Sequence, residues 1–118
     1  MAKVEKFEDL ICWQKANELV KEIYKITSTA LFSKDYALKD QSRRAAISIP
    51  LNIAEGFGRK SHKEFKMFLF YSHGSIAELQ ACLYIARDLS YIDLKTFNIF
   101  YNNCMEISKI ISGLIKSL

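Results

Sequence analysis

Two histidines, His62 and His73, are the side chains in this sequence best suited to acid–base or metal chemistry. They are eleven residues apart and form neither an H-x-x-x-H nor an H-E-x-x-H pattern, so no metal pair on one helical face is predicted. His73-Gly74-Ser75 superficially resembles a hydrolase nucleophile, but a nucleophile elbow needs a strand, a turn and G-x-S-x-G spacing. We expect no catalytic, metal or cofactor site, and we interpret Gly74 and Ser75 as small residues that let another helix approach closely.

The three cysteines are Cys12, Cys82 and Cys104, an odd number without C-x-x-C spacing. They predict neither a disulfide framework nor a structural zinc site. The longest apolar run outside the small residues, Met67 to Tyr71, is far too short to span a bilayer. The first residues mix both charge signs and lack the apolar region of a secretory signal. A cytoplasmic location without membrane contact is therefore expected.

A polar strip, Gln41, Ser48, Asn52 and Glu55, runs along one side of an otherwise apolar helical segment. Glu55 is its only acid, and the sequence supplies no partner acid or obvious base. A hydrogen-bond network that sets the register of neighbouring helices is one interpretation, and a functional role of these side chains is the other.

Positive charge is concentrated between Lys39 and Lys66, where cations outnumber acids by four, which equals the net charge of the whole chain. The cationic residues are Lys39, Arg43, Arg44, Arg59, Lys60, Lys63 and Lys66. Part of this segment precedes a predicted helix, whose free N–H groups and dipole also attract phosphate. The pattern favours nucleic-acid contact. A solvated basic face is the alternative, because no helix-turn-helix, RNA-recognition or zinc-finger motif is present.

Apolar residues recur at helical spacing through almost the whole chain. A first helix is expected over about Phe7 to Thr29, followed by a short connection in which Ser33 could cap the second helix. The second helix, about Asp35 to Gly56, contains Pro50, which should bend it. We expect Gly56-Phe57-Gly58 to end that helix in the left-handed conformation.

Ser61-His62-Lys63-Glu64 is a capping box, and it predicts a third helix from there to about Ser90. Asp93 is expected to cap a fourth helix that runs to near the end of the sequence. Only four glycines and one proline occur, too few for an all-β chain. The expected fold is all-α, an antiparallel up-down-up-down four-helix bundle formed by residues 1–118 as one domain.

The third and fourth helices carry more apolar surface than one bundle core needs. The fourth has two apolar seams, and the third adds large apolar residues outside its main stripe. We expect self-association through aromatic residues, with Phe70, Tyr71, Phe100 and Tyr101 at the interface between subunits. The alternative is that these are ordinary exposed apolar side chains.

Several blocks of sequence together resemble one protein family. They are Trp13-Gln14-Lys15-Ala16, the run Gln41 to Pro50 continuing into Asn52-Ile53-Ala54-Glu55-Gly56, Glu64-Phe65-x-x-Phe68-Leu69, and Gly74-Ser75-x-x-Glu78-Leu79. The chain resembles the four-helix-bundle proteins encoded in intervening sequences of bacterial large-subunit ribosomal RNA genes. That family is similar to the accessory variability determinant proteins of diversity-generating retroelements.

The resemblance implies an antiparallel four-helix protomer that assembles into a ring-like homopentamer. In the retroelement relatives, the basic pentamer binds nucleic acid and a reverse transcriptase. By this resemblance Arg43 and Arg44 are candidates for nucleic-acid contact.

The expected function is that of a non-enzymatic oligomer that binds RNA or DNA through residues 39–66. The expected contact residues are Arg43, Arg44, Arg59, Lys60, Lys63 and Lys66. The alternative is a structural or adaptor module that binds another protein, such as a polymerase or reverse transcriptase.

Overall fold

Four long helices make up most of the protein, and the computed structural model describes residues 4–118. They are α1 (Ile11–Thr27), α2 (Tyr36–Gly58), α3 (His62–Asp88) and α4 (Leu94–Ser117). Two single 3-10 turns, η1 (Phe7–Asp9) and η2 (Phe32–Lys34), precede α1 and α2. The described residues contain no strand, so the predictions of an all-α fold and of four helices are confirmed.

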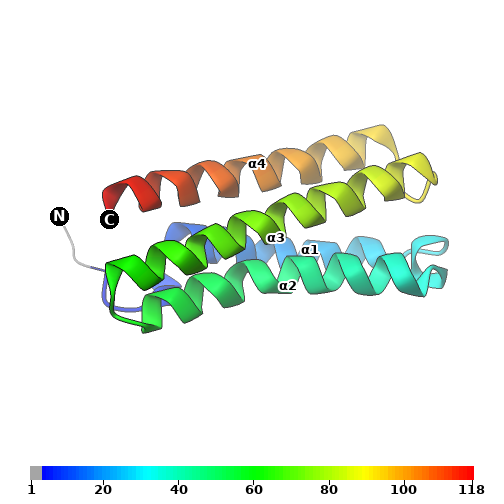
Figure 1. Cartoon of the computed structure of the whole chain (residues 1–118). Helices are drawn as coiled ribbons and strands as arrows, with labels where there is room; N and C mark the ends of the chain where they lie inside the picture. The colour runs from blue at the N-terminus through cyan, green and yellow to red at the C-terminus, as the bar shows by residue number, and fades with distance from the viewer. Residues whose placement is uncertain (1–3) are drawn as a thin grey trace.

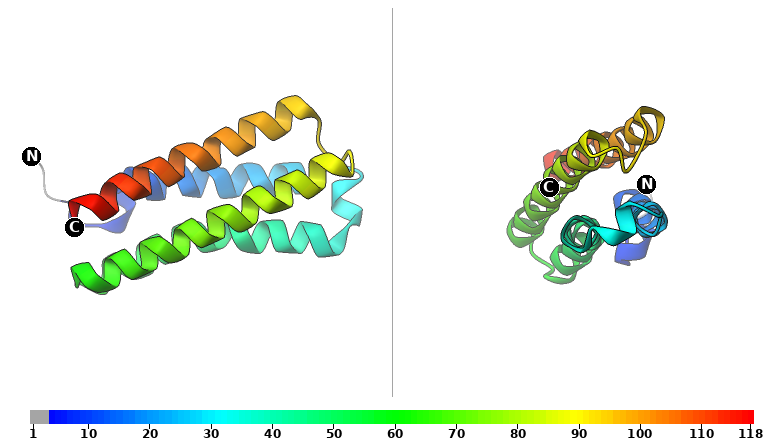
Figure 2. Two further views of the ribbon diagram at one scale, coloured as in Figure 1. Left: turned by 45° about the horizontal axis from the view of Figure 1, so that its top comes forward. Right: turned by 90° about the vertical axis from the view of Figure 1, so that its right-hand side faces the viewer.

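The helices lie side by side in an elongated bundle of 45 × 23 × 18 Å (Figure 1). One end of the bundle holds the α2–α3 turn, η1 and the last turn of α4, and we call it the terminal end (Figures 1 and 2). The opposite end holds the α1–α2 and α3–α4 connections, and we call it the loop end. Packing is most extensive between α2 and α3 and much sparser between α1 and α4.

Side-chain caps begin three of the helices. Asp35 accepts a hydrogen bond from the Leu38 N–H (3.0 Å), Ser61 from the Glu64 N–H (3.4 Å) and Asp93 from the Thr96 N–H (2.7 Å). The caps predicted at Ser61 and Asp93 are therefore confirmed. The cap predicted at Ser33 is wrong, because Ser33 lies within η2 and its hydroxyl donates to the Ala30 carbonyl.

The first predicted helix is broken at its start. Leu10 adopts an extended conformation between η1 and α1, and its side chain is buried in the core. Phe7, on the other side of the break, packs edge-on against Trp13 with ring centroids 5.2 Å apart. The break gives both apolar side chains a partner inside the protein, which helical spacing alone did not indicate.

The prediction that the glycines end α2 in the left-handed conformation is also wrong. The helix continues through Gly58, and the residue with positive φ in the turn is Lys60 (φ 59°). Gly56 instead lies where α2 meets α3, and a Cβ added there would come within 2.6 Å of the Phe68 Cβ. A glycine is needed at this position because the neighbouring helix occupies the space of a side chain.

The close approach expected at Gly74 does not occur there. Gly74 is exposed, and an added Cβ would meet nothing within 4 Å. The two helices are instead linked by hydroxyl groups, from Ser48 to Ser75 (2.5 Å) and from Ser72 to the Ile49 carbonyl (3.0 Å). That carbonyl adjoins Pro50, which lies buried inside α2 and lacks an N–H for the helical ladder.

The two glycines near the end of α2 give a matched test of this packing. Gly58→Ala adds a Cβ into open space, so it should raise the free energy of unfolding by up to about 1 kcal/mol through helix propensity. Gly56→Ala should lower it by about 1–3 kcal/mol, because α2 and α3 must move apart. Urea denaturation measures both changes, and a Gly56→Ala protein as stable as the wild type would contradict the packing argument.

Candidate nucleic-acid interface

The basic segment predicted from the sequence is divided into two groups in space. Arg43 and Arg44 lie in the first half of α2, whereas Arg59, Lys60, Lys63 and Lys66 lie around the α2–α3 turn at the terminal end. Fifteen helical residues separate Arg44 from Arg59, which corresponds to about 22 Å along the axis. The two groups therefore cannot form one continuous basic patch, and each has its own surroundings.

Arg43 is bound to the end of α1. Its Nε donates to Thr27 Oγ1 (2.8 Å), and its Nη2 donates to Ser28 Oγ (3.1 Å) and to the Tyr24 carbonyl (3.4 Å). The guanidinium also lies over the Tyr24 ring, 4.3 Å from its centroid. A cation at a helix C-terminus is favourable, because the last carbonyls there lack helical partners. We therefore assign Arg43 to the joint between α1 and α2 rather than to an interface.

Arg44 points away from α1 and is largely exposed. Its Nε pairs with Asp40 Oδ2 at 2.8 Å, one helical turn earlier. An exposed pair of this kind contributes little to stability and leaves the guanidinium partly neutralised. Arg44 is thus accessible but isolated from the cations of the terminal end.

Arg59 is the most strongly paired cation of the terminal end. Its guanidinium lies 3.4 Å from a Glu55 oxygen, 3.8 Å from a Glu64 oxygen, and over the Phe68 ring. These contacts join the last turn of α2 to the first turn of α3. With two carboxylates beside it, Arg59 adds little net positive potential, and its main role is to hold the α2–α3 turn.

Lysines supply the free positive charge at the terminal end. Lys60, Lys63 and Lys66 belong to no ion pair among residues 4–118, and Lys60 and Lys63 are exposed. Two more lysines near this end, Lys109 and Lys116, are exposed on the last turns of α4 and were not among the predicted contact residues. Their spacing of seven residues places both on one helical face, and this pattern in the sequence could have predicted a basic face on the fourth helix.

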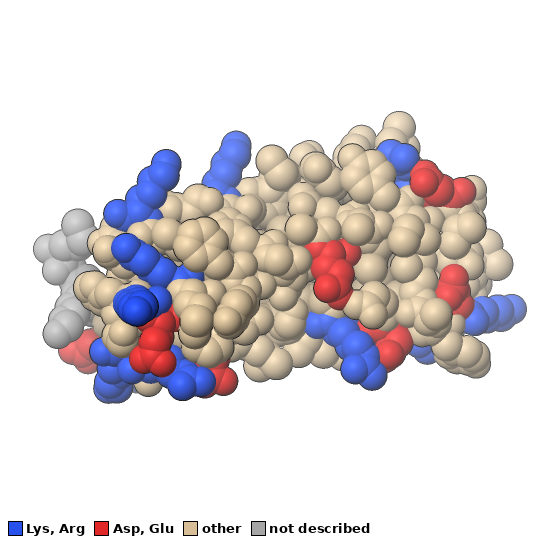
Figure 3. All heavy atoms as spheres, viewed as in Figure 1, with Lys and Arg blue, Asp and Glu red and all other residues tan. Residues whose placement is uncertain are grey.

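Figure 3 shows Lys and Arg side chains gathered over the terminal end, with few on the middle of the face in view. The acids Glu5, Glu8 and Asp9 lie on the η1 side of this end. The positive surface therefore faces outward from the α2–α3 turn and from the last turns of α4. We call the set Lys60, Lys63, Lys66, Lys109 and Lys116 the lysine surface.

The polar strip of α2 is only partly buried. Gln41 and Glu55 are exposed, and Gln41 donates to Glu78 of α3. Ser48 donates to both Ser75 and the Ala45 carbonyl, and Asn52 donates to the Ser48 carbonyl (2.8 Å). Two of its four members thus join α2 to α3, Asn52 bonds within α2, and Glu55 pairs with Arg59. This arrangement agrees with a role in helix register.

The four aromatic residues predicted at a subunit interface have different environments. Phe70 and Tyr71 are exposed on α3, by 58% and 50% of their surface. The prediction that Phe100 lies at the subunit interface is wrong, because Phe100 is 6% exposed and belongs to the core of the protomer. Tyr101 is half-buried against Tyr84 and Phe97, with ring centroids 5.7 and 5.5 Å away. Part of the second apolar seam of α4, including Phe100, therefore packs inside the protomer.

His73 bonds two serines of α4. Its Nδ1 lies 3.1 Å from Ser108 Oγ and its Nε2 lies 3.2 Å from Ser112 Oγ. Burial lowers the pKa of His73, so the neutral ring is favoured. No carboxylate bonds the ring among the described residues, and the contacts join α3 to α4.

The cysteines are free and buried. Burial raises the pKa of Cys12 to about 11 and that of Cys104 to about 12, so both thiols remain protonated. Within residues 4–118, His, Cys, Asp and Glu side chains form no group of three that could hold a metal ion. None of the helices in that range is long and apolar enough to cross a membrane.

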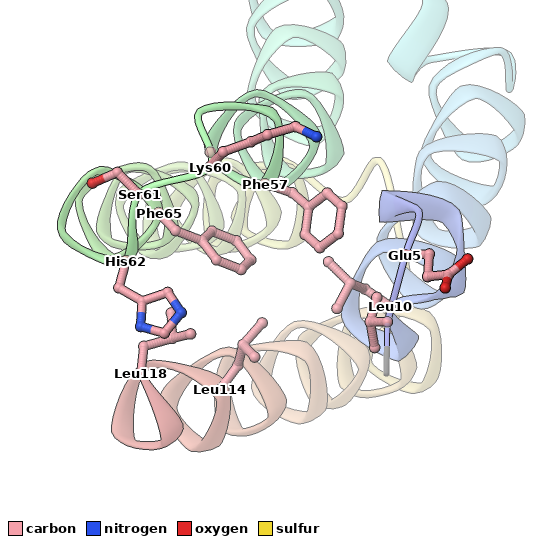
Figure 4. Close-up of a pocket in the computed structure, with 11 residues that line it drawn as sticks. Glu5, Leu10, Phe57, Lys60, Ser61, His62, Phe65, Leu114 and Leu118 are labelled. Atoms are coloured by element: carbon pink, nitrogen blue, oxygen red, sulfur yellow. The ribbon is translucent and has the colours of Figure 1, made fainter. Parts of the chain in front are cut away.

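The terminal end also contains a cavity of about 590 Å³, which we call the end cavity (Figure 4). Phe57 and Phe65 lie on one side of it and Leu114 and Leu118 on the other, with Leu10 closing a third side. Lys60, Ser61 and His62 line the edge formed by the α2–α3 turn, and Glu5 lies on the far edge. An apolar hollow with a few polar groups at its edge is the usual form of a ligand site.

Comparison with known proteins identifies the family of this chain and solved structures that share its fold. The family model described as 23S rRNA-intervening sequence protein matches residues 8–113. The chain is similar to the crystal structure of a protein with unknown function from the S23 ribosomal protein family of Bacteroides thetaiotaomicron, with a TM-score of 0.82 and 24% identity. The match covers 90% of this chain and 99% of that one, and it shows a shared fold. No curated protein matches this chain.

The adjacent arginines of α2 allow the joint between α1 and α2 to be tested. Arg43→Met removes the hydrogen bonds to α1 and leaves Thr27 and the Tyr24 carbonyl without this donor, so it should lower the free energy of unfolding by about 1–3 kcal/mol. Arg44→Met removes one exposed ion pair and should change it by less than about 1 kcal/mol. Chemical denaturation of both variants measures the difference, and equal losses would contradict the assignment of Arg43.

Proposed function

The chain belongs to the 23S rRNA-intervening sequence protein family, and we propose that it is a non-enzymatic, oligomeric protein that binds RNA or DNA through its lysine surface. In this proposal the protomer is an antiparallel up-down-up-down bundle, and the oligomer is the ring-like homopentamer that the sequence resemblance implies. Binding occurs through the phosphate backbone and discriminates little between sequences.

The observation that carries this proposal is the position of the unpaired lysines. Lys60, Lys63 and Lys66 come from the α2–α3 turn, and Lys109 and Lys116 come from the last turns of α4. Several other cations are held in local ion pairs, such as Lys21 with Glu18 and Lys25 with Glu22, whereas Lys34, Lys39 and Lys95 at the loop end are, within the described residues, unpaired like the lysines of the terminal end. A cluster of free cations attracts phosphates, and each phosphate that it neutralises releases a bound counterion.

Each protomer offers few phosphate contacts, so a single lysine surface binds nucleic acid weakly. An oligomer repeats this surface in every subunit. After one subunit has bound a strand, its neighbours meet the same strand at high effective concentration, and weak contacts combine into a useful affinity. Assembly and nucleic-acid binding are therefore linked in the proposal.

An exposed face of α3 supports self-association. Met67, Phe70, Tyr71 and Ile85 lie within about 100° of the helix circumference, with Gly74, Glu78 and Ala81 between them. Lys63, one turn before Met67, lies in the same sector and lines one hollow with Met67, Phe70 and Tyr71. Large apolar residues around small ones allow another helix to pack closely, and exposed apolar patches on one face often mark protein interfaces. We place the subunit contact on this α3 face, which retains Phe70 and Tyr71 from the expected interface and omits Phe100.

The second candidate function is that of an adaptor for another protein, such as a polymerase or reverse transcriptase. The same α3 face favours it, because an apolar surface can bind a different chain as well as a second copy. The two functions differ in salt dependence, since binding through lysines weakens steeply with salt and binding through aromatic residues does not.

Salt dependence gives the direct test of nucleic-acid binding. The logarithm of the affinity for RNA or DNA should fall linearly with the logarithm of the salt concentration. Combining Lys60→Gln, Lys63→Gln and Lys66→Gln should reduce the magnitude of that slope by about 2–3, because each lost phosphate contact contributes about 0.7–0.9. Fluorescence anisotropy over a series of salt concentrations measures the slope.

The matched control combines Lys34→Gln, Lys39→Gln and Lys95→Gln, which removes the same charge from the loop end. It should leave the slope nearly unchanged. Equal effects of the two triple variants would contradict the assignment to the terminal end. If the wild-type protein retains no RNA or DNA at low salt, the adaptor function takes precedence.

Light scattering tests the assembly. The wild-type protein at micromolar concentration should show a mass several times the 13.6 kDa of one chain. Phe70→Asp should reduce it towards one chain while helical circular dichroism persists, because Phe70 is 58% exposed and lies outside the core. Tyr36→Asp, at an exposed aromatic residue near the loop end, is the control and should leave the mass unchanged. A monomeric wild type would remove the ring and leave the α3 face for a different partner.

A further inference from the structure

We propose that the end cavity receives the base of an unpaired nucleotide while lysines beside its mouth hold the adjoining phosphates. This inference rests on the proposed nucleic-acid binding and adds a preference for unpaired strands over duplexes. It depends on the position of the cavity, the side chains of its wall and the spread of charge around it.

The cavity distinguishes the terminal end from the loop end. At the loop end Phe32 is 1% exposed, its ring packs against Tyr91, and the Tyr91 hydroxyl donates to Asp35 Oδ2 (3.0 Å). These contacts close the core at that end. At the terminal end the ends of four helices diverge around about 590 Å³ of open space, lined by Leu10, Phe57, Phe65, Leu114 and Leu118 (Figure 4). Leu10 and Phe65 are buried, whereas Phe57, Leu114 and Leu118 are only partly buried, so within residues 4–118 part of this apolar wall remains in contact with solvent, which is unfavourable.

The wall offers flat surfaces for a base. Phe57 is only partly buried and offers ring surface to the hollow, whereas Phe65, which meets it edge to face with ring centroids 5.8 Å apart, is 8% exposed and belongs to the core. His62 projects into the same hollow towards Leu118 (Figure 4). Bases of every type stack on aromatic rings, so such a site needs no specific hydrogen bonds within the wall. The open mouth leaves the polar edge of the base in contact with water.

Charges around the mouth fit a polyanion better than a single anionic group. Lys60 lies at the edge of the cavity, beside the first N–H groups of α3, which lack helical acceptors. Lys63 and Lys66 do not line the cavity; they lie farther along α3, beside a separate hollow formed with Met67, Phe70 and Tyr71, and Lys116 lies on the last turn of α4. Glu5, the one acid at the edge, is on the opposite side from His62. A carboxylate with an aliphatic tail would use only the cation at the edge, whereas a strand can place successive phosphates along the rest.

A base inside a duplex cannot reach the cavity without losing its pair and its stacking on both neighbours. An unpaired nucleotide has no base pair to lose and gives up less stacking when its base enters the cavity. The end cavity therefore favours single strands, loops and bulges, while the lysine surface attracts paired and unpaired strands alike.

Fluorescence anisotropy with three labelled DNA oligonucleotides of equal charge tests the inference. They are a single strand, the same strand with abasic sites in place of its bases, and a hairpin with the same number of phosphates. The intact single strand should bind about tenfold more tightly than the abasic strand and the hairpin, since stacking of one base accounts for a change of that size.

A variant that fills the cavity shows where the base binds. Leu114→Trp should remove the difference between intact and abasic strands and leave the affinity for the abasic strand unchanged. Asn98→Trp, an exposed substitution in the first turns of α4 near the loop end, is the control and should preserve the difference. Circular dichroism establishes that both variants keep their helices.

The outcomes separate the two proposals. Binding of none of the three oligonucleotides, together with no retention of an RNA strand of the same length at low salt, would refute the proposed function. Equal binding of all three would leave nucleic-acid binding intact and refute the role of the end cavity. A difference that persists in Leu114→Trp would show that the base is bound elsewhere, and this inference would again fail.

Discussion

The close approach of α2 to α3 fixes where the other parts of this protein lie, and it depends on small side chains at two levels. At Gly56 the neighbouring helix occupies the space of a Cβ, and about two turns earlier in α2 the hydroxyl of Ser48 bonds Ser75 of α3 while the hydroxyl of Ser72 of α3 bonds the Ile49 carbonyl of α2. A larger residue at either level would separate the helices. Because Arg59 pairs with carboxylates on both helices, this contact also sets the α2–α3 turn, and with it the direction of Lys60 and Lys63.

The block of α2 that contributes most to the sequence resemblance is explained largely by packing. Arg43 binds the end of α1, Ser48 binds α3, and Gly56 admits α3. Each of these side chains satisfies a geometric need of a helix with neighbours on two sides, and none requires a ligand. A specific sequence motif can thus record a helix-packing arrangement, and in this protein the residues proposed to bind nucleic acid lie mainly outside that motif.

The two ends of the bundle differ in physical character, and this difference is the basis of the proposed function. The loop end is closed by aromatic packing and by the bond between Tyr91 and Asp35. The terminal end has an apolar hollow and free lysines from segments that are far apart in the sequence. Charge attracts a strand to this end and the hollow can retain an unpaired base, so attraction and selectivity come from adjacent surfaces. The apolar face of α3 remains available for contacts between subunits.

The sequence by itself determined the all-α fold, the four helices and the caps at Ser61 and Asp93, because helical periodicity and capping are local properties of the chain. It also located the excess of positive charge between residues 39 and 66. Only the tertiary structure decided which of these cations are free, since Arg43 and Arg59 differ from Lys60 in the partners that other helices or turns bring to them. Phe100 and Phe70 likewise occupy similar apolar patterns, yet one is core and the other surface. That distinction, like the end cavity, depends on how helix ends meet in space, and local spacing along the chain does not contain this information.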